Sequence, residues 1–446
     1  MGFVQKNKKT DMVTLLSVIF WGLSNVVSGQ VVKGLIYFLL EISYIFYMID
    51  AGIHSLGKML TLGTSSQTMV FDEAQGIYVI GQGDNSMLIL LYGVITLVIT
   101  AVFIGVWVVS VKSGRNARNL KAANRKVPGF IDDIKELFNS NIHRLFLFIP
   151  AAGILIFTVM PLIYMILIAF TNYDAGHQPP GNLFTWVGLD NFKAMLSTTD
   201  KLSATFWPIL GWTFIWGFVA TFSCYFGGIF LAILINSKGI KGKKVWRTIF
   251  ITTMAIPTFI SLLVVSTMLG KSGIINVLLQ QWGFITEPLP FLTNGTWAKA
   301  TVIVVNLWVG VPVTMLMVSG ILMNIPAELY ESAKIDGANA FTTFRKITFP
   351  YMWFITTPYL ITNLISNFNN FGVIYFLTGG SPSTLEYYKG AGKTDLLVTW
   401  LYKLTKDSKD YNLAATIGIL IFVISAVFSW IMYSRSNALK NEEGFQ

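Results

Sequence analysis

The feature that most constrains this chain is a series of long apolar segments, each separated from the next by a polar stretch. A helix rises about 1.5 Å per residue, so about twenty such residues cross the roughly 30 Å hydrocarbon core of a bilayer. Inside lipid a helix satisfies its own backbone hydrogen bonds. With 54% hydrophobic and 12% charged residues and a mean hydropathy of +0.61, the chain is too apolar for a soluble globule. The sequence predicts an all-α polytopic membrane protein.

We predict about eight transmembrane helices, and the polar residues between them set their limits. The expected spans are 31–49, 87–109, 145–171, 206–235, 249–269, 300–323, 352–377 and 414–433. An interfacial or partly inserted helix is expected at 12–28. Glu41 lies within the first span, where an unpaired carboxylate is costly, so we expect it to face protein.

The distribution of charge predicts the orientation. The chain has 32 Lys and Arg against 22 Asp and Glu, a formal net charge of +10. The basic residues cluster beside apolar runs, notably at 112–126 and 238–247, as cytoplasmic loops do. The excess therefore indicates topology rather than nucleic-acid binding, and we expect a multi-pass protein of the cell membrane with both termini in the cytoplasm.

Four parts follow from this topology. Residues 1–111 form an N-terminal interfacial helix and two transmembrane helices, and residues 112–144 form a basic cytoplasmic linker. Residues 145–434 form a six-helix core, and 435–446 form a cytoplasmic tail.

A polar segment at 326–350 interrupts the core and predicts a helix-turn-helix elbow. Pro326 suits a first helical turn, and Gly337 suits the left-handed position after a helix. Asn339 can cap a second short helix, which we expect to end near Thr348 because Pro350 disfavours helix at the residue before it.

The elbow presents small residues to a partner. The expected exposed surface consists of Ala327, Ser332, Ala333 and Gly337, which would allow a groove to approach closely. The alternative is an ordinary cytoplasmic loop, and the spacing alone does not decide between the two.

The sixth and seventh spans carry amides where lipid-facing helices are apolar. Asn363, Asn367 and Asn370 recur at helical spacing and form one stripe, and Asn306 lies in the sixth span. Gly310 and Pro312 of that span could break the helix and expose backbone groups. Amides pair with hydroxyls as donors and acceptors, which suits a neutral polyol. The alternative is that the amides join neighbouring helices and contact no substrate.

Catalytic and metal sites are not predicted. The three histidines lack metal-ligand spacing, and Cys224 is interpreted as a small buried hydrophobe. Gly390–Thr394 imitates the end of a phosphate loop, but Tyr387 stands where the first glycine is needed. We therefore expect no ATPase site, cofactor or metal in this chain.

The segment Glu331-Ser332-Ala333-Lys334-Ile335-Asp336-Gly337-Ala338, followed by Ile347-Thr348-Phe349-Pro350, resembles the EAA loop of binding-protein-dependent ABC importer permeases. Ser332 replaces the usual second alanine. The resemblance implies a coupling helix that docks into a cleft of an ATPase subunit. The implied coupling residues are Glu331, Ser332, Ala333, Asp336, Gly337 and Pro350.

Two further motifs, 306–312 and 367–371, resemble the sixth and seventh spans of the F subunit of maltose-type permeases. The loop at 172–206 is short, and in this it is similar to the Gram-positive form of that subunit. Val313 and Ser366 replace aromatic residues of the maltose pattern, so the resemblance does not decide which sugar is transported or its chain length. The resemblance implies sugar contacts at Asn306, Val309, Gly310, Val313, Asn363, Ser366, Asn367 and Asn370.

The resemblance implies the permease subunit of an ATP-driven importer for maltose, maltodextrin or related oligosaccharides. Its expected partners are a second homologous permease, a cytoplasmic ATPase dimer that holds ATP and Mg, and an extracellular solute-binding protein. One alternative is an ion-coupled secondary sugar transporter, which would need ionisable residues deep in the core spans, where this chain is nearly free of them. Another is an ABC permease for a different oligosaccharide.

Overall fold

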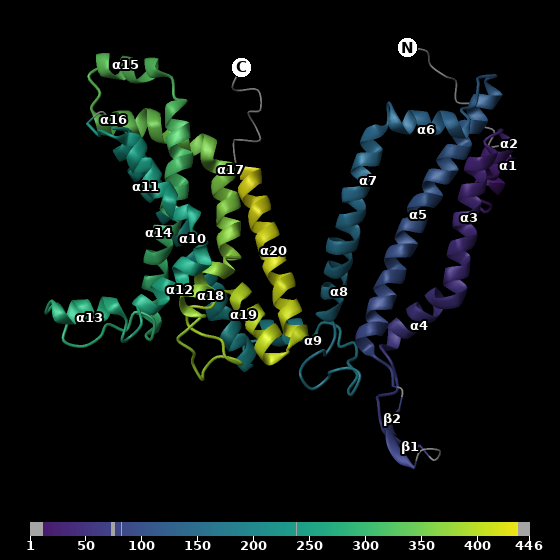
Figure 1. Cartoon of the computed structure of the whole chain (residues 1–446), viewed down its shortest axis with the longest axis horizontal. Coiled ribbons are helices and arrows are strands. Elements are labelled where there is room, and N and C mark those ends of the chain that lie inside the picture. Colours follow the sequence, from purple (N-terminus) through teal and green to yellow (C-terminus); the bar gives the residue numbers. More distant parts are fainter. Residues whose placement is uncertain (1–11, 73–75, 82, 238, 436–446) are drawn as a thin grey trace. The chain divides into compact units, whose positions relative to one another are not determined.

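The computed structural model describes residues 12–72, 76–81, 83–237 and 239–435. All but the first residue of the predicted tail, 435–446, lies outside them. The chain forms two compact units, Met1–Gly188 and Leu189–Gln446. Helices dominate both (Figure 1), as the composition predicts.

The first unit contains most of the predicted N-terminal part. Its elements are α1 (Met12–Leu16), α2 (Leu23–Val27), α3 (Val31–Tyr47), the π-helical turn η1 (Met48–Gly52), α4 (Ile53–Thr61), β1 (Met69–Asp72), β2 (Ile77–Ile80), α5 (Ser86–Ala122), α6 (Phe130–Phe138), α7 (Ile142–Ile154), η2 (Leu155–Val159) and α8 (Met160–Ile168). The two strands pair antiparallel, with Met69 opposite Ile80.

The second unit contains the amide-bearing helices and the elbow. Its elements are α9 (Asp190–Leu196), α10 (Lys201–Asn236), α11 (Lys243–Ala255), α12 (Thr258–Met268), α13 (Ile274–Gln281), α14 (Gly295–Met323), α15 (Ala327–Ile335), α16 (Ala340–Thr343), η3 (Phe344–Thr348), α17 (Phe349–Phe368), α18 (Phe371–Thr378), α19 (Leu397–Lys403), η4 (Leu404–Ser408) and α20 (Tyr411–Arg435).

Most predicted spans are present as helices. Among the described residues, six helices are long and apolar enough to cross a membrane, and the pair α11 and α12 makes up to seven. That pair is bent by 89° at the break between Ala255 and Thr258, which contains Pro257. The expected span 352–377 is not among them. Its residues are divided between α17 and α18, and α17 is long enough to cross but contains many polar residues and prolines.

The first unit differs from the prediction mainly in where helices end. The stretch 12–28 forms two short helices rather than one. Helix α5 continues to Ala122, so part of the predicted linker at 112–144 is a helical extension. The expectation for Glu41 is confirmed, because the backbone N–H of Trp21 donates to its carboxylate at 2.9 Å.

Packing places the unit boundary at Gly188, inside the predicted six-helix core. Helices α7 and α8 pack with the first unit, where α8 contacts α5. The division of the chain into a permease core and N-terminal parts is a functional one, and it stays a prediction.

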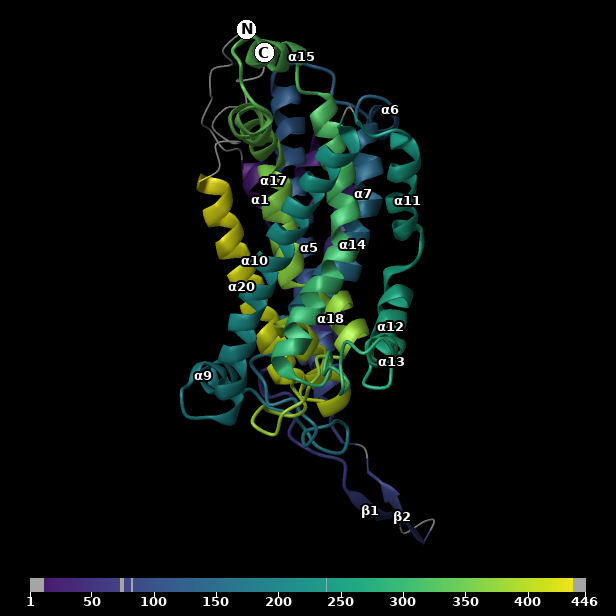
Figure 2. The ribbon, with the colours of Figure 1, turned by 90° about the vertical axis from the view of Figure 1, so that its left-hand side faces the viewer.

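Helix α10 is the centre of the second unit. It packs most extensively against α14 and next against α17, and the views in Figures 1 and 2 both show it beside α14. Its largest fully buried side chains are Trp216 and Tyr225, and Tyr225 shares a hydrogen bond of 2.7 Å with Thr356 of α17. Residues along α10 therefore determine which parts of α14 and α17 meet.

The break that Gly310 and Pro312 could cause does not occur. Helix α14 runs without interruption from Gly295 to Met323 with Pro312 buried inside it. The Thr314 hydroxyl donates to the Gly310 carbonyl of the same helix at 3.2 Å. Dense packing against α10 holds the helix together.

Candidate translocation and coupling sites

The amide of Asn367, near the end of α17, is anchored on α10. Its Nδ2 donates to Thr221 Oγ1 at 2.9 Å, and its backbone carbonyl accepts from Trp216 Nε1 at 3.1 Å. All three residues are buried. Because buried polar groups are costly without partners, these bonds fix the C-terminal end of α17 against α10.

Asn306 of α14 is held by Cys224, which lies one turn after Thr221 on α10. Its Nδ2 lies 3.3 Å from Cys224 Sγ, and the thiol donates to the Asn306 carbonyl at 3.6 Å. A side-chain Cβ at Gly310 would lie 2.6 Å from Cys224 Sγ, so glycine is needed there for α14 to approach α10. Thr221 and Cys224 thus bring the two predicted amide helices together.

Asn363 and Asn370 extend the amide cluster, which consists of these two residues with Asn306 and Asn367. Asn370 Nδ2 donates to Asn367 Oδ1 at 3.2 Å, and Asn367 Nδ2 lies 3.5 Å from Asn363 Oδ1. Both Asn363 and Asn370 are half-buried, so part of their hydrogen-bonding capacity remains open.

The prediction of one continuous seventh span is wrong at Asn370. Helix α17 ends at Phe368, and the Asn370 side chain caps α18 by accepting from the Val373 N–H at 3.2 Å. Asparagine competes for backbone hydrogen bonds in this way, and so it favours helix ends over interiors. Asn370 still contacts Asn367, but across a helix break and not along one helical stripe.

The remaining predicted sugar contacts lie nearer the surface of the chain. Val309 and Gly310 are half-buried, and Ser366 is exposed. Val313 is 40% exposed. The structure therefore joins the four amides and Gly310 around α10, while Val313 and Ser366 face outward.

Sequence reasoning missed the residues of α10 that hold the amide cluster, which are Trp216, Thr221 and Cys224. All lie within the expected span 206–235, where Thr221 is a small polar residue in an apolar run. A polar residue within an apolar span was the sequence signal that could have indicated a contact with another helix. Cys224 is buried, as expected.

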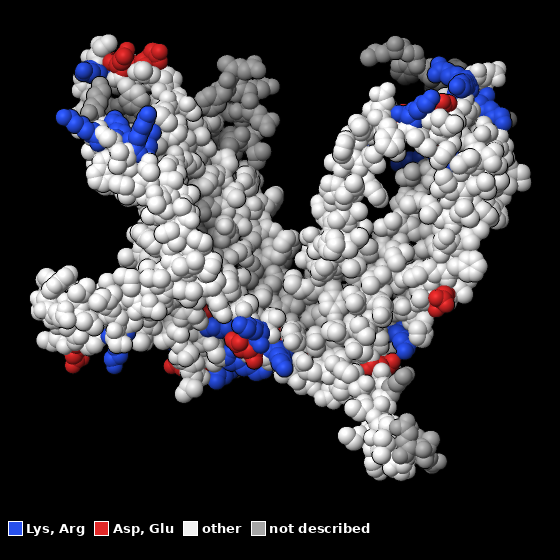
Figure 3. Space-filling model, viewed as in Figure 1, with Lys and Arg blue, Asp and Glu red and all other residues white. Residues whose placement is uncertain are grey.

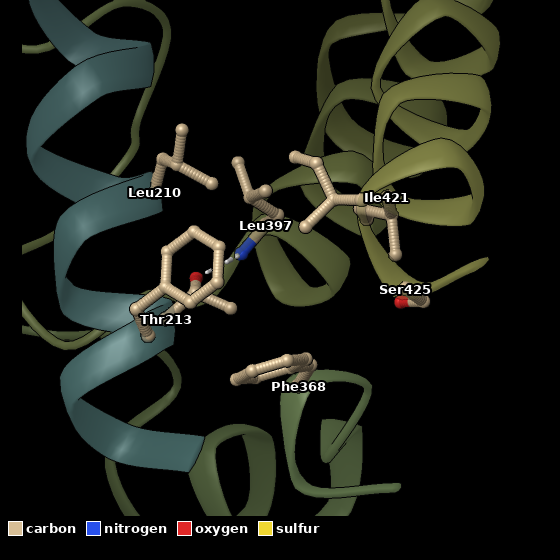
Figure 4. Close-up of a pocket in the computed structure, with 8 residues that line it drawn as sticks. Leu210, Thr213, Phe368, Leu397, Ile421 and Ser425 are labelled. Carbon is tan, nitrogen blue, oxygen red and sulfur yellow. Dashed lines mark hydrogen bonds between the residues drawn. The ribbon is translucent and has the colours of Figure 1, made fainter. Parts of the chain in front are cut away.

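A small apolar cavity nearby is not large enough for a sugar. It lies between α10, α17 and α20, and its volume is about 10 Å³, close to that of one water position. Figure 4 shows Phe368 and Ile421 at its edge and the Leu397 N–H donating to Thr213 Oγ1. The cavity is a packing defect at a helix junction.

The elbow at 326–350 has the predicted turn. The backbone of Gly337 is left-handed, with φ of +74°. The N–H of Gly337 donates to the Lys334 carbonyl at 3.2 Å, and that of Ala338 donates to the Ala333 carbonyl at 2.9 Å. These two bonds form a Schellman motif, which ends α15. The predicted cap is also confirmed, because Asn339 Oδ1 accepts from the Thr342 N–H at 2.8 Å.

The second helix of the elbow does not end near Thr348, so that prediction is wrong. It passes through the π-helical turn η3 directly into α17, with Pro350 near the start of α17. A π turn shifts the hydrogen-bond register by one residue, which accommodates the missing N–H of a proline. The Tyr330 hydroxyl lies 3.1 Å from Thr348 Oγ1 and ties the two arms together.

The outer face of the elbow includes most of the predicted coupling residues. Glu331, Ser332, Asp336, Gly337 and Pro350 are exposed. Ala333 is buried instead, so its expected place on the exposed surface is wrong. A helix has only one outward face, and Ala333 lies on the opposite one, toward its own chain. Figure 3 shows acidic side chains at this end of the unit, above Lys and Arg.

A buried ion pair organises the connection between α18 and α19. The Asp395 carboxylate is buried and lies 2.7 Å from Lys403 Nζ. It also accepts from the Gly392 N–H at 2.7 Å and the Thr399 hydroxyl at 2.9 Å. Burial raises the pKa of Asp395, and the Lys403 charge opposes that shift.

Comparison with known proteins assigns the chain to a family. The family described as "Binding-protein-dependent transport system inner membrane component" matches residues 225–438, which include both amide helices and the elbow. The maltodextrin transport system permease protein MdxF of Bacillus subtilis (strain 168) is 35% identical over 445 residues, covering 98% of each chain. The chain belongs to this family of permeases. It is a membrane component of a transport system.

Other similar proteins are named for different oligosaccharides or polysaccharides. The galactooligosaccharides transport system permease protein GanP of B. subtilis (strain 168) is 33% identical and covers 96% of this chain and 99% of its own. A solved bacterial alginate ABC transporter, in complex with an alginate pentasaccharide-bound periplasmic protein, has a TM-score of 0.56 at 21% identity. That match covers 69% of this chain and 98% of the other. The structural match supports the fold.

Proposed function

We propose that this chain is the permease subunit of an ATP-driven ABC importer for maltodextrins or related oligosaccharides. The full-length similarity to MdxF favours maltodextrin. GanP is nearly as similar, so oligosaccharides are the substrate class that the names of both relatives share. The choice of sugar would then depend on side chains such as Val313 and Ser366.

The observation that carries this proposal is an uncharged amide cluster with open hydrogen-bonding capacity at the break between α17 and α18. Asn306 and Asn367 are committed to α10, so they act mainly as helix contacts. Asn363 and Asn370 are half-buried and can exchange hydrogen bonds with sugar hydroxyls. Helices α14 and α17, which carry all of these amides but Asn370, contain no carboxylate, and this disfavours the ion-coupled alternative.

The elbow supplies the coupling surface in this proposal. Its exposed residues would dock into a cleft of a cytoplasmic ATPase dimer, which binds and hydrolyses ATP with Mg. Both termini would lie on the same cytoplasmic side. The continuous path from η3 into α17 supports this role, because movement of the elbow would be transmitted along a helix that ends at Phe368, next to Asn367 and the helix break.

Two further partners complete the proposed importer. A second homologous permease would cover the outward-facing Val313 and Ser366 and close the sugar path. An extracellular solute-binding protein would deliver the sugar. The solved alginate transporter holds such a protein, which supports this kind of partner here.

The test of the sugar site separates substrate contact from helix capping. Asn370→Ala removes both the cap of α18 and the amide, whereas Asn370→Ser keeps a capping hydroxyl and removes the amide. Loss of one sugar hydrogen bond costs about 1–3 kcal/mol, so both variants should reduce uptake about five- to a hundredfold. Uptake of labelled maltodextrin by the reconstituted complex is the measurement.

The adjacent Asn369 provides a matched control. It is exposed, and its amide donates to the Ile365 carbonyl of its own helix. Asn369→Ala should therefore transport normally. Normal uptake by Asn370→Ser together with loss of uptake by Asn370→Ala would show that Asn370 only caps α18, and the sugar site would have to lie elsewhere.

A further inference from the structure

The first unit contains a large pocket that the transport mechanism does not use. Its volume is about 620 Å³, and it lies between the start of α3, the last turns of α5, and the segment from α6 to the start of α7. The side chains that define this α5–α6 pocket are Lys33, Lys112, Asn116, Asp133, Glu136 and Arg144. Figure 1 shows α6 running across the ends of α5 and α7.

The pocket has an excess of positive charge. Lys33 is paired with Asp133 at 2.9 Å, and Glu136 accepts from the Asn141 amide at 2.8 Å. Lys112 and Arg144 have no acidic partner among the residues that the structure describes. Three basic and two acidic side chains line the pocket, so its net charge is +1. Lys112 and Arg144 are the two cations left to contact an anionic ligand. Figure 3 shows Lys and Arg gathered at this end of the unit.

Apolar surfaces adjoin the pocket. Ile131 and Phe138 of α6 are 66% and 60% exposed, and Phe146 of α7 and Val109 of α5 are 68% and 56% exposed. A helix with an apolar face beside charged side chains is typical of the boundary between headgroups and acyl chains. The pocket thus lies where a polar headgroup could enter while acyl chains follow the exposed apolar side chains.

We propose that the α5–α6 pocket binds the headgroup phosphate of an anionic phospholipid. The Arg144 guanidinium can hold two phosphate oxygens at once, and Lys112 adds a second charge. The Asn116 amide is a further hydrogen-bond donor in the same wall. Phosphate is the chemistry recognised, and the apolar surroundings favour a lipid over a free phosphate ion. Lipid binding would hold α6 and the end of α5 at the membrane surface. This inference does not depend on the transported sugar.

The experiment measures lipid binding to the purified full chain by native mass spectrometry. The protein is titrated with phosphatidylglycerol and, separately, with phosphatidylcholine of the same acyl chains. Wild-type protein should bind phosphatidylglycerol more tightly. In Lys112→Ala/Arg144→Ala its affinity should fall about tenfold or more, because both charge-assisted contacts to the phosphate are lost.

Two variants control for charge and for folding. Arg115→Ala/Arg125→Ala removes the same amount of charge from residues that do not line the pocket. It should weaken binding less than about threefold, because neither side chain is a direct contact of the proposed phosphate. Lys112→Arg/Arg144→Lys keeps the charge and should keep most of the binding. Equal losses in the two alanine pairs, or no preference between the lipids, would overturn the proposal. Displacement of phosphatidylglycerol by excess inorganic phosphate would overturn the assignment to lipid.

Discussion

At the scale of single residues, Gly337 has the clearest role in the coupling surface. Its φ of +74° is accessible to glycine at little cost, whereas most side chains are strained there by about 1–2 kcal/mol. Apart from its two chain neighbours, no described residue has an atom within 4 Å of an added Cβ. Internal packing therefore does not require glycine, and a close partner would explain the absence of a side chain.

Gly337→Asp should abolish uptake and crosslinking of the elbow to the ATPase, because the side chain adds bulk and charge to the docking surface. Gly337→Asn has the same size and tolerates the left-handed backbone better, so it isolates the steric effect and should also impair docking. Crosslinking yield and sugar uptake in the reconstituted complex are the readouts.

Gly283 offers a matched control for backbone strain. Its φ is +75°, and an added Cβ there would also meet open space, but it lies outside the elbow. Gly283→Asp should lose similar stability and still transport. If both Gly337 variants crosslink and transport as wild type does, the elbow is not the docking surface.

At the scale of elements, the connection between α18 and α19 depends on one buried charge. Asp395 is inaccessible, and the Lys403 side chain is 14% exposed. Removing one member of a buried pair leaves the other charge uncompensated, at a cost of about 3–5 kcal/mol. The backbone around Gly392 is bonded to the same carboxylate. The pair therefore holds the connection in one conformation.

Asp395→Asn should lower the thermal midpoint of the detergent-purified protein markedly. Asp395→Leu/Lys403→Met removes both charges and should recover part of the loss. The matched control is Glu386→Gln, which breaks an ion pair to Lys393 at 3.2 Å in the same connection with the carboxylate 76% exposed. Exposed pairs contribute about 0–1 kcal/mol. Midpoints that fall equally in Asp395→Asn and Glu386→Gln would contradict this account.

At the scale of the whole molecule, the described chain holds parts for moving a substrate but no group identified as an energy source. The amide cluster is uncharged, and the described residues contain no group of three or more His, Cys, Asp and Glu that could hold a metal ion. In the proposed importer the elbow is the docking surface for another protein. We therefore expect energy to reach the proposed sugar path through an ATPase partner.

Uptake by the reconstituted complex should follow ATP and ignore the proton gradient. The test collapses ΔpH and ΔΨ with ionophores and, in a separate sample, replaces the phosphate-loop lysine of the ATPase. Uptake should survive the ionophores and stop with the ATPase variant. The opposite result would favour an ion-coupled carrier, whereas loss in both samples would show that the gradient also contributes.

Local sequence determined the apolar segments and most of the turn chemistry. Apolar length predicts helices that cross a bilayer, and the Gly337 turn, the Asn339 cap and the interruption at Pro257 follow from backbone preferences of single residues. The EAA-like motif could also be identified from the sequence, because its residues are adjacent in the chain.

Tertiary structure decided where helices continue and which amides meet. Proline preferences favoured breaks near Thr348 and at Pro312, but a π turn and packing against α10 keep both helices intact. Thr221 and Cys224 join Asn367 and Asn306 from a segment more than eighty residues away, a pairing that no local preference encodes. Ala333 is buried for a similar reason: the sequence placed it on a short helix, and only the packing of that helix determined which face points inward.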